Sequence, residues 1–462
     1  MALIGIIFAA ATAVWYLQLF RRGGLFAGCL LVVLLGSVFG FGFLHVSVIT
    51  LDRVSCGILL LAYIVERWRG RTLSGPVTIT DGIFLFFITT LTVSTLTHDW
   101  KYDNAQPMSR LLLLYAMPGC LYWVARHTKV STRQIRWFLI STIVFGVYLS
   151  LIAIAEVWEL DALVFPKFIV NSPHEEFLGR ARGPFLNPVA NGTFIVTCLM
   201  STWMAWPFAS RRERPFLVAA SLLLYIGTAA TLTRGVWLGA AATTLLAIWF
   251  IFPQRKRIGL TILLATLGIG LAIPQWDHLV TFKRDRYVSV VDMAFSAKLR
   301  PMLAAVAWNM FADHPIQGVG FGQYKQRDNE FISKHNFDMP LHQVRPYVQH
   351  NVIFALLTEV GLLGTVPFLL LLGAWTRNAV RLWADHSVEF AMRAVSLIFL
   401  AYLVNYLVNG MFHDVALIQM MNLGLFFLAG LMMSICQSTR VTQAEELPTY
   451  ETRPQSSSLT LT

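Results

Sequence analysis

Two arginines are candidates to bind an anion. One is isolated between hydrophobic stretches, and the second lies in a polar segment. Arg234 divides two hydrophobic stretches within TLTRGVWLG at 231–239, whereas Arg300 precedes DHPIQGVGFGQY at 313–324. An arginine at a membrane edge faces a cavity or an anion in most proteins, because an isolated charge at the bilayer centre costs about 2.5–3.5 kcal/mol. The residues alone leave an alternative without an anion open for each arginine. In that alternative, Arg234 is a loop arginine that reaches the interface, and Arg300 is a solvated loop charge.

His350 is a candidate proton acceptor. It opens the apolar run HNVIFALLTEVGLLG at 350–364, so it lies at a helix start. The positive end of the helix dipole disfavours an imidazolium, which favours a neutral histidine there. Tyr347, His350 and Asn351 share a face if the helix begins early enough, whereas Glu359 falls about half a turn away. An interfacial histidine that only caps the helix is the alternative.

No other pattern in the sequence indicates a cofactor or a metal. The glycines at 318–322 are not a dinucleotide fingerprint, because no strand precedes them and no helix with an acidic ribose partner follows. The five cysteines form no C-x-x-C pair, which argues against a thiolate metal site. The sequence contains no D-x-D motif. We therefore predict no cofactor and no metal ligand.

The elements that position these residues are predicted to be membrane helices. Of 462 residues, 56% are hydrophobic and only 13% are charged, with a mean hydropathy of +0.61. A hydrocarbon core of about 30 Å needs about 20 apolar residues per helix, and such runs follow one another almost end to end. They are continuous and not alternating, which excludes a closed β-barrel. The fold class predicted is an all-α polytopic membrane protein.

Apolar runs predict about 12–13 transmembrane helices. The expected spans are 2–20, 24–45, 47–65, 82–97, 109–125, 135–158, 187–208, 215–232, 235–252, 257–273, 348–375, 390–409 and 411–435. The net charge of +11 does not indicate nucleic acid, because Arg and Lys gather in short clusters between these runs. All these clusters fall on one side of the membrane, which the positive-inside rule assigns to the cytoplasm.

This topology divides the chain into six parts. They are N-terminal transmembrane helices (1–160), a periplasmic loop (161–186), central transmembrane helices with the TLTRG motif (187–273), a large periplasmic loop carrying short helices (274–347), C-terminal transmembrane helices (348–436) and a disordered cytoplasmic tail (437–462). The two polar segments on the outer face are the expected place of function, because the second is long enough to fold as a small cap.

Three motifs in this order resemble the O-antigen ligase and O-antigen polymerase superfamily. They are TLTRGVWLG, the arginine before DHPIQGVGFGQY, and HNVIFALLTEVGLLG, and the resemblance covers roughly residues 180–364. It implies a membrane-embedded, inverting and metal-independent glycosyltransferase. Such enzymes take a glycan from undecaprenyl pyrophosphate at the periplasmic side of the bacterial inner membrane.

The resemblance also implies roles for individual residues. Arg234 and Arg300 resemble the arginine pair that holds the donor pyrophosphate, and His350 resembles the proposed general base. Guanidinium groups suit these roles, because their planar fork matches phosphate oxygens. The family often has an aromatic residue four positions after the loop arginine, where this chain has Ala304.

A further segment, GRARGPFLNP at 179–188, resembles the arginine-bearing stretch that leads into a family membrane helix. We therefore expect Arg180 and Arg182 among the glycan or phosphate contacts. Tyr347 and Asn351, which share a face with His350, are also expected among these contacts. A structural loop arginine is the alternative for Arg182.

The expected function is transfer of a glycan from a polyprenyl-pyrophosphate donor to an acceptor hydroxyl, on lipopolysaccharide core or a similar acceptor. The expected partners are that donor, the acceptor and membrane lipids. A polymerase of the same superfamily is an alternative within the class. A lipid-linked glycan transporter or flippase, or a non-catalytic membrane scaffold, belongs to another class. Transporters commonly show internal repeats, and this sequence shows none.

Overall fold

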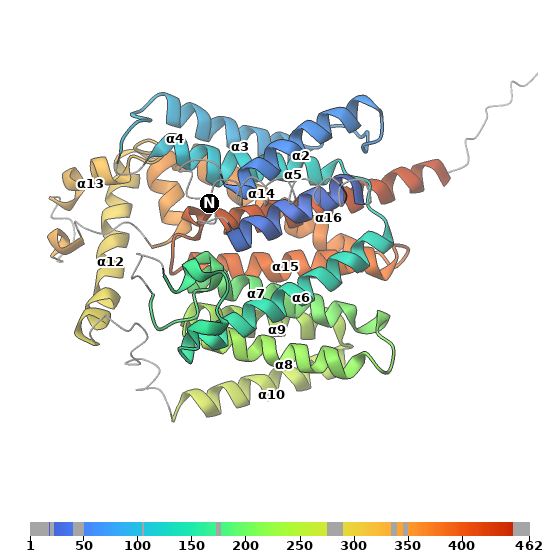
Figure 1. Cartoon of the computed structure of the whole chain (residues 1–462). Helices are drawn as coiled ribbons and strands as arrows, with labels where there is room; N and C mark the ends of the chain where they lie inside the picture. Colours follow the sequence, from blue (N-terminus) through green and yellow to red (C-terminus); the bar gives the residue numbers. More distant parts are fainter. Residues whose placement is uncertain are drawn as a thin grey trace, which may run out of the picture.

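The structure is a computed structural model that describes residues 18, 23–39, 50–103, 106–171, 177–274, 290–333, 340–344 and 350–446. Every regular element in this part of the chain is helical, so the all-α prediction is confirmed. The long helices lie side by side in one bundle, with α12 and α13 at one end (Figure 1). The end of α16 projects from the opposite end of the bundle.

The helix bounds follow the apolar runs closely in the middle of the chain. The long helices are α2 Leu51–Trp68, α3 Ile79–Leu96, α5 Met117–Arg126, α6 Thr132–Val157, α7 Pro188–Ala205, α8 Arg214–Ala230, α9 Arg234–Ile251, α10 Gln254–Ala272, α12 Val290–Asp313, α13 Tyr324–Ile332, α14 Val352–Ala384, α15 Phe390–Gly410 and α16 Gln419–Glu446. The short elements are α4 Pro107–Arg110, the π-helix η1 Leu111–Ala116, and the 3₁₀ turns η2 Asp161–Leu163, η3 Lys167–Ile169, η4 Gly183–Phe185, η5 Trp206–Phe208, η6 Leu341–Val344 and η7 Val415–Leu417. A further helix occupies Gly23–Phe39.

Seven helices of the described residues are long and apolar enough to cross a membrane, judged by length and composition. They are Ile79–Leu96, Pro107–Arg126, Thr132–Val157, Arg234–Ile251, Val352–Ala384, Phe390–Gly410 and Gln419–Thr439. Two shorter apolar helices, Gly23–Phe39 and α8, accompany them. The polytopic membrane class is thereby confirmed, whereas the total of about 12–13 spans stays a prediction.

The centre of the bundle is formed by α7 and α15, which are buried along most of their length. A helix that is apolar all round belongs in the interior of a bundle, and α15 indeed packs against α7, α9, α14 and α16. Close approach relies on small residues. A Cβ added at Gly192 would lie 2.3 Å from Cγ1 of Val236, so the Val236 side chain of α9 packs directly on the backbone of α7 there.

Helix α14 is interrupted at Gly361, and residues of the polar loop form hydrogen bonds with the backbone around this break. Gly361 has φ 58° and ψ −156°, values that favour glycine. The N–H of Leu362 donates to the carbonyl of Pro315 (2.8 Å), and the N–H of Val319 donates to the carbonyl of Thr358 (2.8 Å). Backbone groups freed inside an apolar bundle need such partners, because no water replaces them. The segment 318–320 is therefore held against the break in α14 by these hydrogen bonds.

Three features differ from those expected. The loop at 274–347 contains α12, a helix of 24 residues with Pro301 inside it, where the sequence predicted only short helices. Helix α16 continues to Glu446, beyond the boundary predicted at 437, and residues 447–462 lie outside the described part. The predicted span 411–435 begins instead with the turn η7, and its helix starts at Gln419.

Candidate functional site

A cavity of about 90 Å³ lies where α12, the start of α14 and the end of α15 meet. It is lined by Arg300, Leu303, Ala304, His350, Asn351, Phe354 and Met411. Two of the three residues predicted to act directly in chemistry, one from α12 and one from the approach to α14, therefore share one space. Ala304, where the family often has an aromatic residue, forms part of the wall and leaves this space open.

Asn351 fixes the start of α14. Its Oδ1 accepts hydrogen bonds from the N–H of Ile353 (2.8 Å) and of Phe354 (3.1 Å), while its Nδ2 donates to the carbonyl of Met411 (3.2 Å). An asparagine at this position satisfies N–H groups that the helix leaves free. Asn351 thus joins α14 to the end of α15 and holds the neighbouring His350 in place.

His350 has the electrostatic environment of a proton acceptor. Burial, and secondly the guanidinium of Arg300, lower its pKa below the ordinary value of 6.5. The imidazole is consequently neutral at neutral pH. The His413 ring lies 6.4 Å from the His350 ring, centroid to centroid, in an edge-to-face arrangement.

Arg300 is presented to the cavity by a helix with its own apolar support. Leu299, on one side of it, belongs to a small buried cluster that joins α12 to α13 and η6. The Arg300 side chain is exposed, and its guanidinium carbon lies 5.7 Å from the centre of the Phe412 ring. A cation over an aromatic face is stabilised by the ring.

Arg234 begins α9 beside the same aromatic residue. A Cβ added at Gly235 would lie 3.9 Å from Cδ2 of Phe412 and 2.7 Å from Oδ1 of Asn409. The first turn of α9 therefore contacts the connection that also supports Arg300. The Arg234 side chain is exposed, and the N-terminus of α9 adds positive potential at this point.

Arg180 supports the turn before α9 from within the protein. Its Nη2 donates to Oγ1 of Thr233 (2.7 Å), the residue that precedes Arg234. The N–H of Ala181 donates to the carbonyl of Ala230 (3.1 Å) in the same turn. Arg180 thereby acts on Arg234 through its neighbour, and it does not line the cavity of about 90 Å³.

Arg182 is buried elsewhere. Its Nη2 donates to the carbonyl of Ile169 (2.7 Å), and the next residue, Gly183, donates its N–H to Oε2 of Glu156 (2.7 Å). Burial lowers the pKa of Arg182, and the attraction of Glu156 opposes that effect. These contacts favour the structural alternative for Arg182. Tyr347, the remaining predicted contact, lies outside the described residues.

Sequence reasoning missed three residues in the connection between α15 and α16. Phe412 lies beside Arg300, His413 lies beside His350, and Asp414 lies near Glu359 and Arg110, but all three were hidden in a run interpreted as one span. Burial, followed by the nearby Glu359 carboxylate, raises the pKa of Asp414 to about 8. The polar pair His-Asp inside an otherwise apolar stretch was the signal that could have found them.

Glu359 is paired with an arginine from another helix. Its Oε1 lies 3.6 Å from Nη1 of Arg110. Among the described residues, no group of three or more His, Cys, Asp or Glu side chains could hold a metal ion. Independence from metals nevertheless stays a prediction.

Comparison with known proteins bears out the resemblance. Residues 219–369 match the family model described as O-antigen ligase. The O-antigen ligase of Salmonella typhimurium (strain LT2) is 27% identical over 229 residues, which are 49% of this chain and 54% of that protein. The chain thus spans about half the length of the curated relative it matches. The family-model match contains Arg234, Arg300 and His350, whereas Arg180 and Arg182 lie before it.

Proposed function

We propose that this chain, which resembles the O-antigen ligase superfamily, is an O-antigen ligase-like glycosyltransferase. It transfers a glycan from a polyprenyl-pyrophosphate donor to an acceptor hydroxyl, on lipopolysaccharide core or a similar acceptor, at the periplasmic face of the inner membrane. The observation that carries the proposal is that Arg300 and His350 line one cavity, next to the start of α9 at Arg234.

In the proposed reaction, His350 accepts the proton of the acceptor hydroxyl. The hydroxyl oxygen attacks the anomeric carbon from the face opposite the pyrophosphate, and the bond from that carbon to the pyrophosphate oxygen breaks with its electron pair. The configuration is therefore inverted. Arg300 and Arg234 stabilise the charge that develops on the leaving pyrophosphate, which is the largest electrostatic demand of the reaction.

The cavity of about 90 Å³ gives reacting groups room beside Arg300 and His350. The lipid and the glycan would extend beyond it. In this proposal the two arginines replace the metal ion that bridges pyrophosphate in other transferases.

The test is reconstitution of the purified full chain in liposomes with an undecaprenyl-pyrophosphate-linked glycan. Lipopolysaccharide core, a second lipid-linked repeat and no acceptor are compared, with and without EDTA. We expect a product on the core acceptor that EDTA does not abolish. A product that forms only on the lipid-linked repeat would identify a polymerase. Movement of the donor across the bilayer without transfer would contradict the proposal and indicate a transporter.

A further inference from the structure

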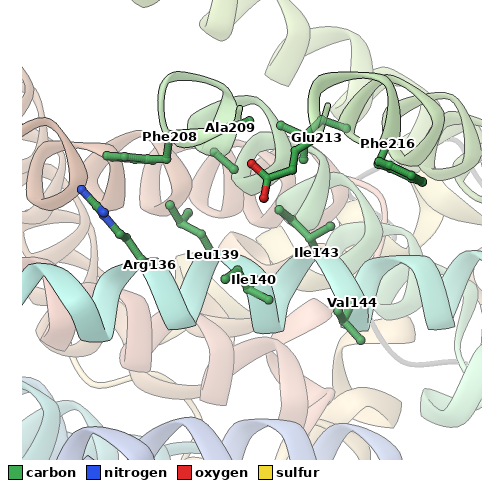
Figure 2. A pocket seen from close by; sticks show the side chains of 11 residues that line it. Arg136, Leu139, Ile140, Ile143, Val144, Phe208, Ala209, Glu213 and Phe216 are labelled. Carbon is green, nitrogen blue, oxygen red and sulfur yellow. The ribbon is translucent and has the colours of Figure 1, made fainter. Parts of the chain in front are cut away.

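A larger groove lies far from this site, between the first turns of α6 and of α8. It has a volume of about 450 Å³ and a mostly apolar lining. It is lined by Arg136, Leu139, Ile140, Ile143, Val144, Ala205, Phe208, Ala209, Glu213, Phe216 and Leu217. Figure 2 shows Arg136 and Phe208 at one end of the groove and Val144 and Phe216 at the other.

The groove lies at the end of the bundle opposite the candidate site. Helix α6 ends at the 177–187 segment, where Glu156 accepts from Gly183, and α8 ends where Ala230 accepts from Ala181. The starts of both helices are therefore remote from the TLTRG turn. Arg136 precedes Glu156 by about 30 Å along α6 at 1.5 Å per residue.

The groove opens towards lipid. Ile140, Val144 and Phe216 line it with 61%, 63% and 75% of their surfaces exposed, whereas Leu139 is buried at 2%. Helix α6 is one of the helices long and apolar enough to cross a membrane. Apolar side chains exposed on such a helix contact acyl chains and not water.

One end of the groove is rich in positive charge. Arg136 lies at this end of the groove, and the turn at 210–214 contains three more arginines and one glutamate. The guanidinium of Arg136 lies 4.9 Å from the centre of the Phe208 ring, which holds it at the mouth. The one carboxylate in the lining, Glu213, accepts a hydrogen bond from the N–H of Ser210 (2.7 Å). Such a polybasic edge attracts an anionic headgroup.

The length of the groove suits an acyl chain. From Arg136 to Val144 the groove follows about 12 Å of α6. An unbranched hydrocarbon chain, one carbon wide, fits this space.

We propose that the α6–α8 groove binds an anionic phospholipid, with one acyl chain along Ile140, Val144 and Phe216 and the headgroup phosphate at Arg136. The arginines of the turn at 210–214 add to the attraction. This site is distinct from the cavity at Arg300 and does not depend on the reaction proposed there.

Native mass spectrometry of the purified full chain tests this site. The protein is released from dodecyl maltoside micelles that contain phosphatidylglycerol or phosphatidylcholine with the same acyl chains. We expect preferential retention of phosphatidylglycerol. Arg136→Gln should weaken its binding about fivefold, as expected for one cation at the membrane surface. Arg133→Gln is the matched control, because Arg133 stacks on Trp137 and does not line the groove.

A second pair of variants tests the contribution of the apolar part of the groove separately from that of its charge. Ala209→Phe fills the groove and should abolish retention of the phospholipid, whereas Ala219→Phe, on the exposed side of α8, should leave it unchanged. Glu213→Gln should strengthen retention of phosphatidylglycerol. Equal retention of the two lipids, or wild-type retention by Ala209→Phe, would overturn the proposal. A photocrosslinker at position 140 that captures a protein instead of a lipid would also overturn it.

Discussion

Two pairs of arginines lie on the same side of this molecule and differ in what surrounds them. Arg234 and Arg300 are exposed; Arg300 lies over the Phe412 ring, and Gly235, the residue after Arg234, approaches the same ring. Arg180 and Arg182 are only 5% and 1% exposed, and their guanidinium groups donate to other parts of the protein. A guanidinium whose N–H groups are used internally stabilises the fold, whereas an exposed one beside a cavity can meet a substrate phosphate.

The comparison also orders the two pairs in space. Arg180 bonds to Thr233, directly before Arg234, so a buried arginine supports the turn that presents an exposed one. Arg182 is a step further away, at the junction of α6 and the 177–187 segment. Sensitivity of activity to substitution should therefore fall from Arg300 to Arg180 and then to Arg182.

The largest effect among the four arginines is expected at Arg300. Arg300→Ala should lower kcat/KM by about 10²–10³-fold, because it removes preorganised charge stabilisation at the leaving group. Arg300→Lys should recover only part of the loss, since it keeps the charge and loses the planar fork. Steady-state transfer assays with reconstituted protein measure both values. Full activity of Arg300→Lys would show that the fork has no role.

An intermediate effect is expected at Arg180. Arg180→Ala removes the bond to Thr233 and should lower turnover about tenfold or more, since a hydrogen bond to a charged group contributes about 1.5–3 kcal/mol and the lower value corresponds to about tenfold. Thr233→Val deletes the same bond from its other end and should give a similar loss. The double variant should be no worse than either single variant, as a double-mutant cycle would show. Additive losses would place Arg180 on the substrate instead.

A smaller effect concerns pH. His350 must be neutral to accept a proton, and its pKa lies below 6.5, so kcat/KM should fall only as the pH drops below that value. Bound pyrophosphate offsets the positive charge of Arg300, so the acid limb of kcat should lie at higher pH than the acid limb of kcat/KM. Arg300→Gln should shift the acid limb of kcat/KM upward. If the acid limb does not shift in this variant, the charge of Arg300 does not lower the pKa of His350.

The smallest effect on activity per folded molecule is expected at Arg182. Arg182→Gln breaks the bond to Ile169 and leaves Glu156 without its positive partner, so the yield and the unfolding temperature should fall. The transfer rate per folded molecule should stay close to that of the wild type. Arg133→Gln serves as the control for an exposed arginine. A donor-binding defect in well-folded Arg182→Gln would restore this residue to the substrate site.

Much of the helical framework was predictable because hydropathy is a local property. The runs 135–158, 235–252 and 390–409 correspond closely to α6, α9 and α15. The break at Gly361 was not predictable, since its backbone partners come from residues 315–320, which no local pattern connects with α14. Helix α12 was underestimated because its apolar face packs on a small cluster and not on the main core.

The site was predictable in part. Motif resemblance selected Arg300 and His350, which line the cavity together, but it also selected Arg182, because sequence does not report whether a charge is buried or exposed. Phe412 and His413 escaped notice because they follow α15 directly, inside a continuous apolar stretch. Their importance depends on tertiary placement beside residues far away in the chain.

The most direct test of the central claim is a single-turnover measurement on His350→Ala with saturating lipid-linked donor and acceptor. A general base contributes about 10²–10⁴-fold, so transfer should slow by that factor while donor affinity stays close to the wild-type value. Normal insertion and folding of the variant are verified first. If well-folded His350→Ala transfers glycan at nearly the wild-type rate, His350 is only a residue at the start of α14 and the proposed mechanism is wrong.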